Sequence, residues 1–377
     1  MHVFVFDTRS FFGATTDFSR SVPPLGLPKV SPRRAQFLVE AVADLRSRLE
    51  SRGSTLHVAV GKSEVELAAM ARRFSATSVL CHRAESTEEE ELHGVVGSAL
   101  AKEGSRGGGA GATLEAFWGN TMYHIDDLPM DPSKDLPPVY TRFRQMVENK
   151  SQVRAPLPIP SPLKPVPVGS SDGDSAGAGA GGAGGAGAGA GGESQEAQGE
   201  AAGAAAEGGE GDGGESKASS AASGNGEIPS LLRLGVIDAD ADEATLATQV
   251  GIDGRAVLAF KGGETEALAR LQYYLFDSDL LQTYKETRNG MIGGDYSGKF
   301  SPWLALGCLS PRLIHAEVRR YERERVENKS TYWMLFELIW RGKAVHGGGV
   351  DARRGRGGGR GAAIEEREGE GGYEGSC

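Results

Sequence analysis

Short apolar runs alternate with amphipathic helical patterns in the first part of the chain. The runs lie at residues 3–6, 56–60, 78–81 and 114–118 and have the length of buried strands. Between the first two runs, Ser31-Pro32 has the form of a helix start, and apolar residues follow it at helical spacing. The alternation predicts an α/β fold in which a doubly wound, Rossmann-like parallel sheet occupies residues 1–165.

After residue 228 the pattern is helical throughout. Ala267, Leu268 and Leu271 recur at helical spacing. Ser301-Pro302 and Ser310-Pro311 each combine an N-cap residue with a proline suited to the first turn of a helix. Residues 228–341 are therefore predicted to form an all-α domain.

Two segments cannot build a core of their own. Glycine makes up 56 of the 377 residues and is concentrated at residues 166–227 and in the tail at residues 342–377. The first segment buries too little apolar surface to offset its ordering entropy, so we expect a disordered linker. Residues 353–361 of the tail are rich in arginine and glycine, and an RNA-binding patch is one interpretation of them.

Charge and cysteine usage exclude several classes of protein. The net charge of −10 argues against a chain coated with nucleic acid, although Arg288, Lys299, Arg312 and Arg341 are available to a local basic cleft. The cysteines, at positions 81, 308 and 377, have no metal-binding spacing and indicate a reducing compartment. No apolar run reaches the roughly 18 residues of a membrane span. We therefore expect an intracellular protein that does not enter membranes.

A glycine-rich loop precedes the helix predicted at Pro302. Its hydroxyls and one lysine come from Ser297, Lys299 and Ser301, with Gly298 between them. Because a helix start exposes unpaired N–H groups, this loop is a candidate phosphate cradle. A capped helical corner without a ligand is the alternative.

Two long segments carry a resemblance to a known family. YKETRNG…DYSGKFSPWLALGCLSPR from Tyr284, followed by NKSTYWMLFELIWR at 328–341, resembles the flavin-binding half of the photolyase/cryptochrome family, most closely the cryptochrome DASH branch. The resemblance covers most of residues 1–165 and 228–341. It implies an α/β antenna domain followed by a helical FAD-binding domain, here truncated, in a protein that we expect to be monomeric.

The resemblance implies FAD as the cofactor. The positions that match the family's flavin contacts are Tyr284, Ser297, Gly298, Lys299, Phe300 and Ser301. For Tyr284, packing on an apolar helix face is an equally simple interpretation. Glu337 and Trp340 match the residues that receive a flipped-out pyrimidine dimer, and Arg288 and Arg341 match residues that hold DNA. Without the resemblance, Glu337 and Arg341 would be a surface ion pair at i and i+4 on a broad apolar helix.

The implied activity is light-driven electron transfer from reduced FAD to a cyclobutane pyrimidine dimer in DNA. Single-stranded DNA is the favoured substrate, since flipping a base costs less there. Two alternatives remain open: a signalling photoreceptor without repair activity, and a non-catalytic fragment with half a flavin site. The family also implies a 5,10-methenyltetrahydrofolate antenna. Its glutamate contact lies two residues after a histidine, whereas Glu85 lies three residues after His82, which is otherwise a strand-end residue.

The chain departs from the family pattern at both ends. It starts at what resembles the family's second strand, so we expect the first strand, with any targeting signal, to precede Met1. Chloroplast, mitochondrion and nucleus all remain open for the full-length protein. The resemblance stops after Arg341, and we hypothesise that Gly342-Lys343 begins a translated intron. Transcript sequencing that shows continuous coding past Arg341 into the tail would refute this hypothesis.

Overall fold

The computed structural model describes residues 1–11, 30–83, 86–106, 111–165, 227–236 and 256–354. These residues belong to one compact unit. The predicted linker at 166–227 lies outside them apart from residue 227, and so do Glu85 and residues 355–377 of the tail.

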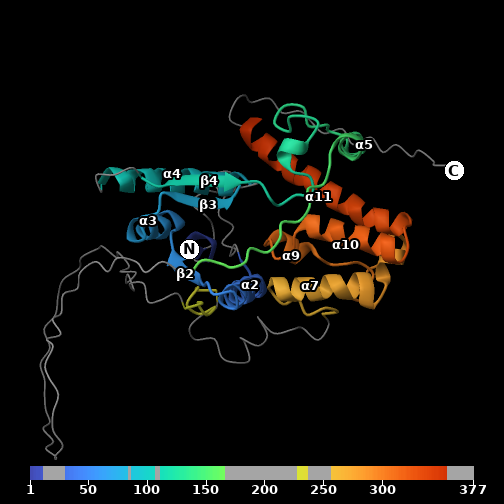
Figure 1. Cartoon of the computed structure of the whole chain (residues 1–377), viewed down its shortest axis with the longest axis horizontal. Helices are drawn as coiled ribbons and strands as arrows, with labels where there is room; N and C mark the ends of the chain where they lie inside the picture. The colour runs from blue at the N-terminus through green and yellow to red at the C-terminus, as the bar shows by residue number, and fades with distance from the viewer. Residues whose placement is uncertain (12–29, 84–85, 107–110, 166–226, 237–255, 355–377) are drawn as a thin grey trace, which may run out of the picture. The chain divides into compact units, whose positions relative to one another are not determined.

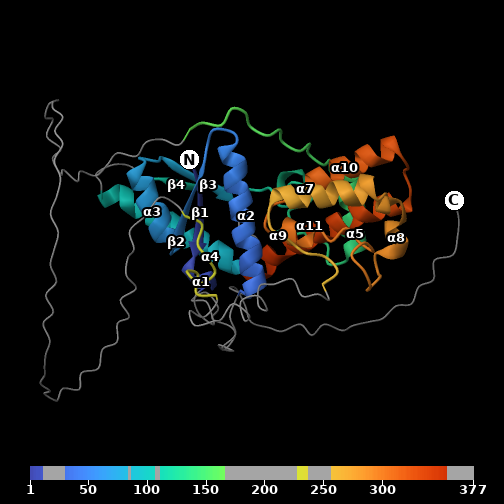
Figure 2. The same cartoon turned by 90° about the horizontal axis from the view of Figure 1, so that it is seen from below.

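The four predicted strands are present and pair in parallel (Figure 2). β1 (His2–Asp7) pairs with β2 (Leu56–Gly61), and β3 (Ser78–His82) pairs with β4 (Thr113–Phe117). The predicted parallel direction is confirmed. The pairs form two separate two-stranded sheets, so the described residues do not contain one continuous four-stranded sheet. The apolar runs predicted the length of the strands and the helices between them predicted the parallel direction, but neither carried information about which strand edges meet.

Helices connect and cover the strands. They are α1 (Thr8–Phe11), α2 (Pro32–Glu50), α3 (Ser63–Arg73) and α4 (Thr87–Arg106). The predicted start of α2 is confirmed, since the Ser31 side chain accepts the Arg34 N–H at 3.4 Å. Buried Val42 of α2 lies in one apolar cluster with Phe6 of β1. Buried Val96 of α4 lies in a second cluster, to which Leu114 of β4 adds a half-buried side chain.

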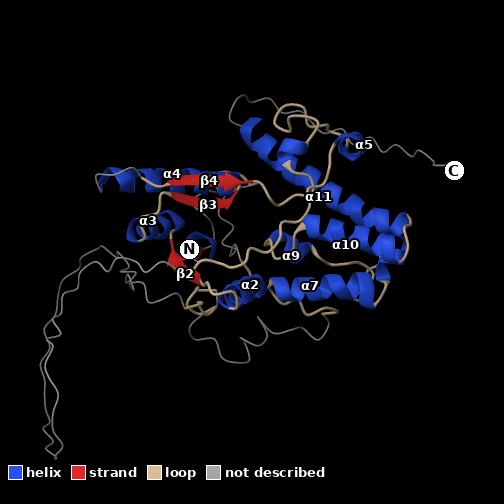
Figure 3. Cartoon of the chain, viewed as in Figure 1, coloured by secondary structure: helices blue, strands red, loops and turns tan. Residues whose placement is uncertain are grey.

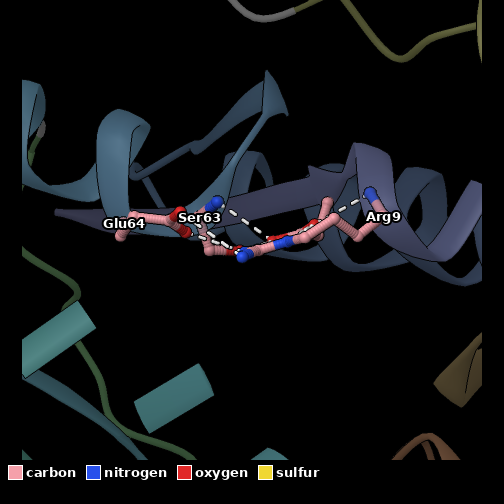
Figure 4. A network of polar contacts seen from close by, with 4 residues as sticks. Arg9, Ser63 and Glu64 are labelled. Carbon is pink, nitrogen blue, oxygen red and sulfur yellow. Dashed lines mark hydrogen bonds and ion pairs between the residues drawn. The ribbon is translucent and has the colours of Figure 1, made fainter. Parts of the chain in front are cut away.

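A polar network joins the end of β1 to the start of α3 (Figure 4). The Asp7 carboxylate accepts the Ser63 N–H at 3.0 Å and the Ser63 hydroxyl at 2.7 Å. The Arg9 guanidinium lies 2.6 Å from Asp7 and 2.7 Å from Glu64. Burial alone would raise the pKa of Asp7, but the hydrogen bonds from Arg9 and Ser63 outweigh it and hold this pKa at about 2.

The second half of the described chain is all-helical, as predicted (Figures 1 and 3). Its longer helices are α7 (Glu264–Gln272), α10 (Pro311–Glu324) and α11 (Lys329–Arg354), and α5 (Tyr140–Lys150) packs against α11 (Figures 1 and 2). Four short elements lie between α7 and α10: η2 (Tyr273–Asp277), η3 (Leu280–Thr283), α8 (Tyr284–Thr287) and α9 (Ser301–Ala305). Another, η1 (Ile125–Asp127), lies between β4 and α5. One apolar core runs through all the longer helices.

The two Ser-Pro helix starts behave differently. Ser310 is the N-cap of α10, and its hydroxyl accepts the Arg312 N–H at 3.3 Å, as predicted. Ser301 is the first residue of α9 and Phe300 is its N-cap, so the predicted cap at Ser301 is wrong. Helix α9 has only five residues. Its macrodipole is correspondingly small, because the dipole grows by adding aligned peptide units.

Helix α11 passes through the predicted boundary at residues 341 and 342. Gly342 and His346 are buried, and the His346 ring stacks on Trp118 with 5.1 Å between ring centroids. The Lys343 ammonium donates to the Pro138 carbonyl oxygen at 2.8 Å. The first residues of the predicted tail thus pack as part of the helical core. Among the described residues, no helix has the length and apolar character of a membrane span.

Helix α2 also fixes the start of α7. Asp44 of α2 accepts the Thr265 hydroxyl at 2.5 Å and the Thr265 N–H at 3.2 Å. Arg48 forms an ion pair with Glu264 at 2.8 Å. A carboxylate supplied by another helix therefore caps α7, where its negative charge suits the N-terminal end of the dipole.

Candidate functional site

The predicted phosphate loop lies between α8 and α9. Gly298 and Phe300 are buried, whereas Lys299 is half-buried. A Cβ atom on Gly298 would lie 2.5 Å from Cε2 of Phe300, so only glycine fits beneath that ring. Lys299 has a φ of +54°, in the left-handed region, and its Nζ atom lies 3.6 Å from the centroid of the Tyr296 ring.

The loop offers hydrogen-bond donors that the protein does not use. Within the described residues, the N–H groups of Gly298 and Lys299 donate to no protein acceptor, and neither do the hydroxyls of Ser297 and Ser301. Free N–H groups, hydroxyls and a lysine are the groups that bind phosphate oxygens. Because α9 is short, these donors rather than a helix dipole make the loop suitable for an anion.

Tyr284, the predicted flavin contact on α8, is buried in the helical core. Its ring meets that of Tyr274 edge-to-face, with 6.3 Å between the centroids. Burial raises the pKa of the Tyr284 hydroxyl to about 12. The structure therefore places this side chain where the packing interpretation predicts, and contact with a flavin stays a prediction.

The predicted substrate residues Arg288 and Glu337 come together across α8 and α11. The Lys285 N–H donates to the Ser330 hydroxyl oxygen at 3.0 Å, and this bond ties α8 to the start of α11. Arg288 forms a hydrogen-bonded ion pair with Glu337, and its guanidinium lies 4.3 Å from the Trp333 ring centroid. Arg288 is thus a partner of Glu337 that spacing along α11 did not predict, and the interpretation of Glu337 and Arg341 as an i, i+4 ion pair stays a prediction.

Arg341 donates hydrogen bonds to the backbone of two other segments. Its guanidinium donates to the carbonyl oxygen of Asn120 and, at 3.3 Å, to that of Leu304. It thereby connects the segment after β4 to α9. Contact between Arg341 and DNA stays a prediction, since the structure shows this side chain engaged with the protein backbone.

The predicted broad apolar face of α11 is two faces. Leu335 and Ile339 are buried in the core. Tyr332, Phe336 and Trp340, spaced four residues apart, form a second row. The Tyr140 ring of α5 meets the Trp340 ring edge-to-face, with 4.2 Å between the ring centroids. Trp340 is 50% exposed. We call Tyr140, Tyr332, Phe336 and Trp340 the aromatic surface.

His82 lies at the end of β3, as its strand-end interpretation predicts. Its exposed ring approaches Gly119 so closely that a Cβ there would meet it. The expected antenna contact, Glu85, lies outside the described residues.

Sequence reasoning missed two residues near the site. Arg270 of α7 is buried beneath the phosphate loop and bonds to it. The signal was a charged residue on an otherwise apolar helix face, one turn after Ala267. Tyr140 donates from its hydroxyl to the Phe336 carbonyl oxygen at 2.9 Å, and no local pattern indicated this contact.

Comparison with known proteins agrees with this arrangement. A family model described as DNA photolyase matches residues 1–163. The chloroplastic/mitochondrial cryptochrome DASH of Ostreococcus tauri is 40% identical over 320 residues, which are 84% of this chain and 50% of that protein. The solved structure of Synechocystis sp. PCC6803 cryptochrome is 32% identical, has a TM-score of 0.64, and aligns with 91% of this chain and 54% of its own.

The chain belongs to the photolyase/cryptochrome family, in its cryptochrome DASH branch.

This cryptochrome DASH chain spans about half the length of the curated relatives it matches. The cryptochrome DASH of Arabidopsis thaliana, also named chloroplastic/mitochondrial, is 37% identical over 339 residues, which are 90% of this chain but 46% of that protein. A bacterial class III photolyase from Agrobacterium tumefaciens, at 18% identity and a TM-score of 0.57, shares the fold. The α/β and helical fold is thus established, and the activity of the whole protein is a matter for proposal.

FAD is the cofactor expected of a cryptochrome DASH protein, and the loop fits it. A pyrophosphate needs several hydrogen-bond donors and a cation. The N–H groups of Gly298 and Lys299, the hydroxyls of Ser297 and Ser301 and the Lys299 ammonium supply both.

Proposed function

We propose that this cryptochrome DASH protein is an FAD-dependent photolyase that repairs cyclobutane pyrimidine dimers, preferably in single-stranded DNA. The observation that carries the proposal is the set of unused donors in residues 297–301, in a loop that directly follows α8 and its Arg288–Glu337 pair. Monomeric state is part of the same proposal.

The chain's own residues have two tasks in this function. Ser297, Lys299 and Ser301, with the Gly298 N–H, hold the pyrophosphate. When bound, FAD supplies the light-driven one-electron chemistry. The protein binds and orients the cofactor and the substrate. The ion pair with Arg288 holds the Glu337 carboxylate in a defined position.

The aromatic surface and Glu337 are the substrate side of the proposal. An exposed tryptophan stacks on an extruded base with about 1–3 kcal/mol, and Trp340 is half exposed. The Glu337 carboxylate accepts hydrogen bonds from the polar edge of a base. In single-stranded DNA no base pair opposes extrusion, which favours this substrate over a duplex.

One observation favours the second candidate function, a photoreceptor without repair activity. Arg288 already occupies the Glu337 carboxylate and covers the Trp333 ring. The ion pair therefore competes with a base for the carboxylate. A chain in which it stays closed would bind flavin and leave dimers intact.

Two finer elements belong to the same proposal. A 5,10-methenyltetrahydrofolate antenna in the α/β part is supported by family membership alone. An organellar location is supported by the names of the Ostreococcus tauri and Arabidopsis thaliana relatives, which are described as chloroplastic/mitochondrial.

Flavin binding is tested first. The chain is purified with excess FAD, free cofactor is removed, and the visible absorption is recorded for the wild type and for Lys299→Ala. We expect a retained flavin band in the wild type and a weaker one in the variant, because the cation near the pyrophosphate is lost. A colourless wild-type protein would contradict the proposed FAD site.

Repair is tested on oligothymidylate that contains cyclobutane dimers, single-stranded or annealed, in light and in darkness. We expect light-dependent loss of dimers that is faster in single strands. Glu337→Gln should slow it about tenfold, the effect of weakening one charge-assisted hydrogen bond. Glu327→Gln is the matched control at an exposed position and should have no effect. Retained flavin without repair would favour the photoreceptor.

A further inference from the structure

Arg270 is a buried charged residue on a helix of the apolar core. It lies on α7 and is 8% exposed, next to the core residues Leu271 and Tyr274. Removing a guanidinium from water is costly unless its donors are satisfied by the protein. The partners of this side chain therefore show what its burial achieves.

Among the described residues, all the polar partners of Arg270 belong to the phosphate loop. Its Nε atom donates to the Gly298 carbonyl oxygen at 3.2 Å. One terminal nitrogen donates to the carbonyl oxygens of Gly294 at 2.9 Å and Ser297 at 3.2 Å. The other lies 3.0 Å from the Asp295 carboxylate. One buried side chain thus holds three backbone carbonyls and a carboxylate of a five-residue stretch.

These bonds determine the direction of the loop's N–H groups. A trans peptide is planar, and its C=O and N–H point in opposite directions. The only cis peptide bond among the described residues precedes Pro162, so the peptides of the loop are trans. Because the carbonyls of Gly294, Ser297 and Gly298 point toward Arg270, the N–H groups of the following residues point away from it.

The residues that follow are Asp295, Gly298 and Lys299. Their N–H groups donate to no protein acceptor within the described part of the chain. Lys299 is left-handed, and Phe300 is right-handed with φ −77° and ψ −9°. Successive residues of opposite hand form the concave backbone arrangement that binds anions.

We propose that Arg270 is a positioning residue, which turns the loop carbonyls toward itself so that the N–H groups face the pyrophosphate of FAD. This rests on the proposed flavin site and deepens it. Arginine is required because its planar fork spreads five donors over four acceptors. Lysine keeps the charge but concentrates its donors at one atom. Arg270→Lys therefore tests geometry at constant charge.

The decisive measurement compares two ligands that differ in their phosphates. Dissociation constants for FAD and for riboflavin, which has no phosphate, are measured for the wild type, Arg270→Lys and the control Arg319→Lys. Arg319 is exposed and pairs with Glu322 on its own helix. We expect Arg270→Lys to weaken FAD about tenfold or more and riboflavin by less than about twofold. Arg319→Lys should change neither.

Equal weakening of both ligands by Arg270→Lys would show a merely structural role and overturn the proposal, as would an unchanged FAD affinity. If Arg270→Lys does not fold, Asp295→Asn replaces it, because the Asp295 side chain is 47% exposed and removing its charge loosens the same network. Asp295→Asn should likewise weaken FAD binding more than riboflavin binding. Equal weakening of both ligands, or no change in FAD affinity, would overturn the proposal.

A second readout separates this proposal from the flavin site itself. If the wild type binds no flavin, hydrogen exchange of the amides at residues 294–300 is measured with and without inorganic pyrophosphate. We expect faster exchange in Arg270→Lys than in the wild type or Arg319→Lys, and protection by pyrophosphate in the wild type only. Equal exchange in the three proteins would overturn the positioning role even though the flavin proposal had already failed.

Discussion

His346 predicts a pH dependence that tests how the chain packs beyond Arg341. Its side chain is 5% exposed, stacks on Trp118, and has an Nδ1 atom without a hydrogen-bond partner in the described residues. Burial lowers its pKa from 6.5 to about 4. The perturbation is His346→Phe, which keeps an aromatic ring in the stack and removes the titrating group.

The sign follows from proton linkage. Between about pH 4 and 6.5 the unfolded chain binds a proton at His346 that the folded chain does not. The free energy of unfolding should therefore fall as the pH falls through this window. The difference between 6.5 and about 4 corresponds to an upper limit of roughly 3 kcal/mol, at about 1.4 kcal/mol per pH unit.

The assay is urea unfolding followed by circular dichroism from about pH 8 to about pH 4. Burial also lowers the pKa of His57, His93 and His315, so the wild type alone cannot isolate one residue. The difference between wild type and His346→Phe does. On acidification, the free energy of unfolding of His346→Phe should fall by up to roughly 3 kcal/mol less than that of the wild type. Parallel curves would refute the buried position of His346.

Three further predictions use the same structure. Gly298→Ala drives a Cβ into the buried Phe300 ring, so it should lower the free energy of unfolding by about 1–3 kcal/mol and abolish flavin retention. The control Gly94→Ala, at an exposed position of α4, should raise the free energy of unfolding by about 0.5–1 kcal/mol. Equal effects of the two substitutions in thermal melts would contradict this prediction. Asp7→Asn should lower the free energy of unfolding by roughly 2 kcal/mol at neutral pH. This difference from the wild type should disappear as the pH falls from about 3.8 through about 2, and a difference independent of pH would count against the Arg9 network. Trp340→Ala should weaken binding of dimer-containing single strands about tenfold while the melting temperature changes little, because the side chain is half exposed; unchanged binding would remove it from the substrate side.

Identical local motifs had different outcomes, which shows where local rules end. Ser310-Pro311 starts a helix of fourteen residues with the predicted cap. Ser301-Pro302 lies at the start of a helix of only five residues. The loop before this helix is held by Arg270 and by the close packing of Gly298 on Phe300. A cap motif determines a helix start only where the preceding chain is free to adopt extended backbone, and Phe300 is right-handed instead.

The sequence by itself determined the element types and the residues of the loop. Strands and helices each have their own spacing of apolar residues, because one face of each element is kept from water. This spacing is visible in the sequence without knowledge of what the element packs against. The parallel direction of the strands follows from the helices between them. The residues that match the family's flavin contacts were also readable from the chain alone.

The tertiary structure decided which groups meet. It separated the strands into two pairs, joined Glu337 to Arg288, which lies 49 residues earlier in the chain, and placed Arg270 under a loop that begins 24 residues later in the chain. Such contacts depend on how helices far apart in sequence pack. The free energy that selects them is shared over the whole apolar core, so no local pattern contains it.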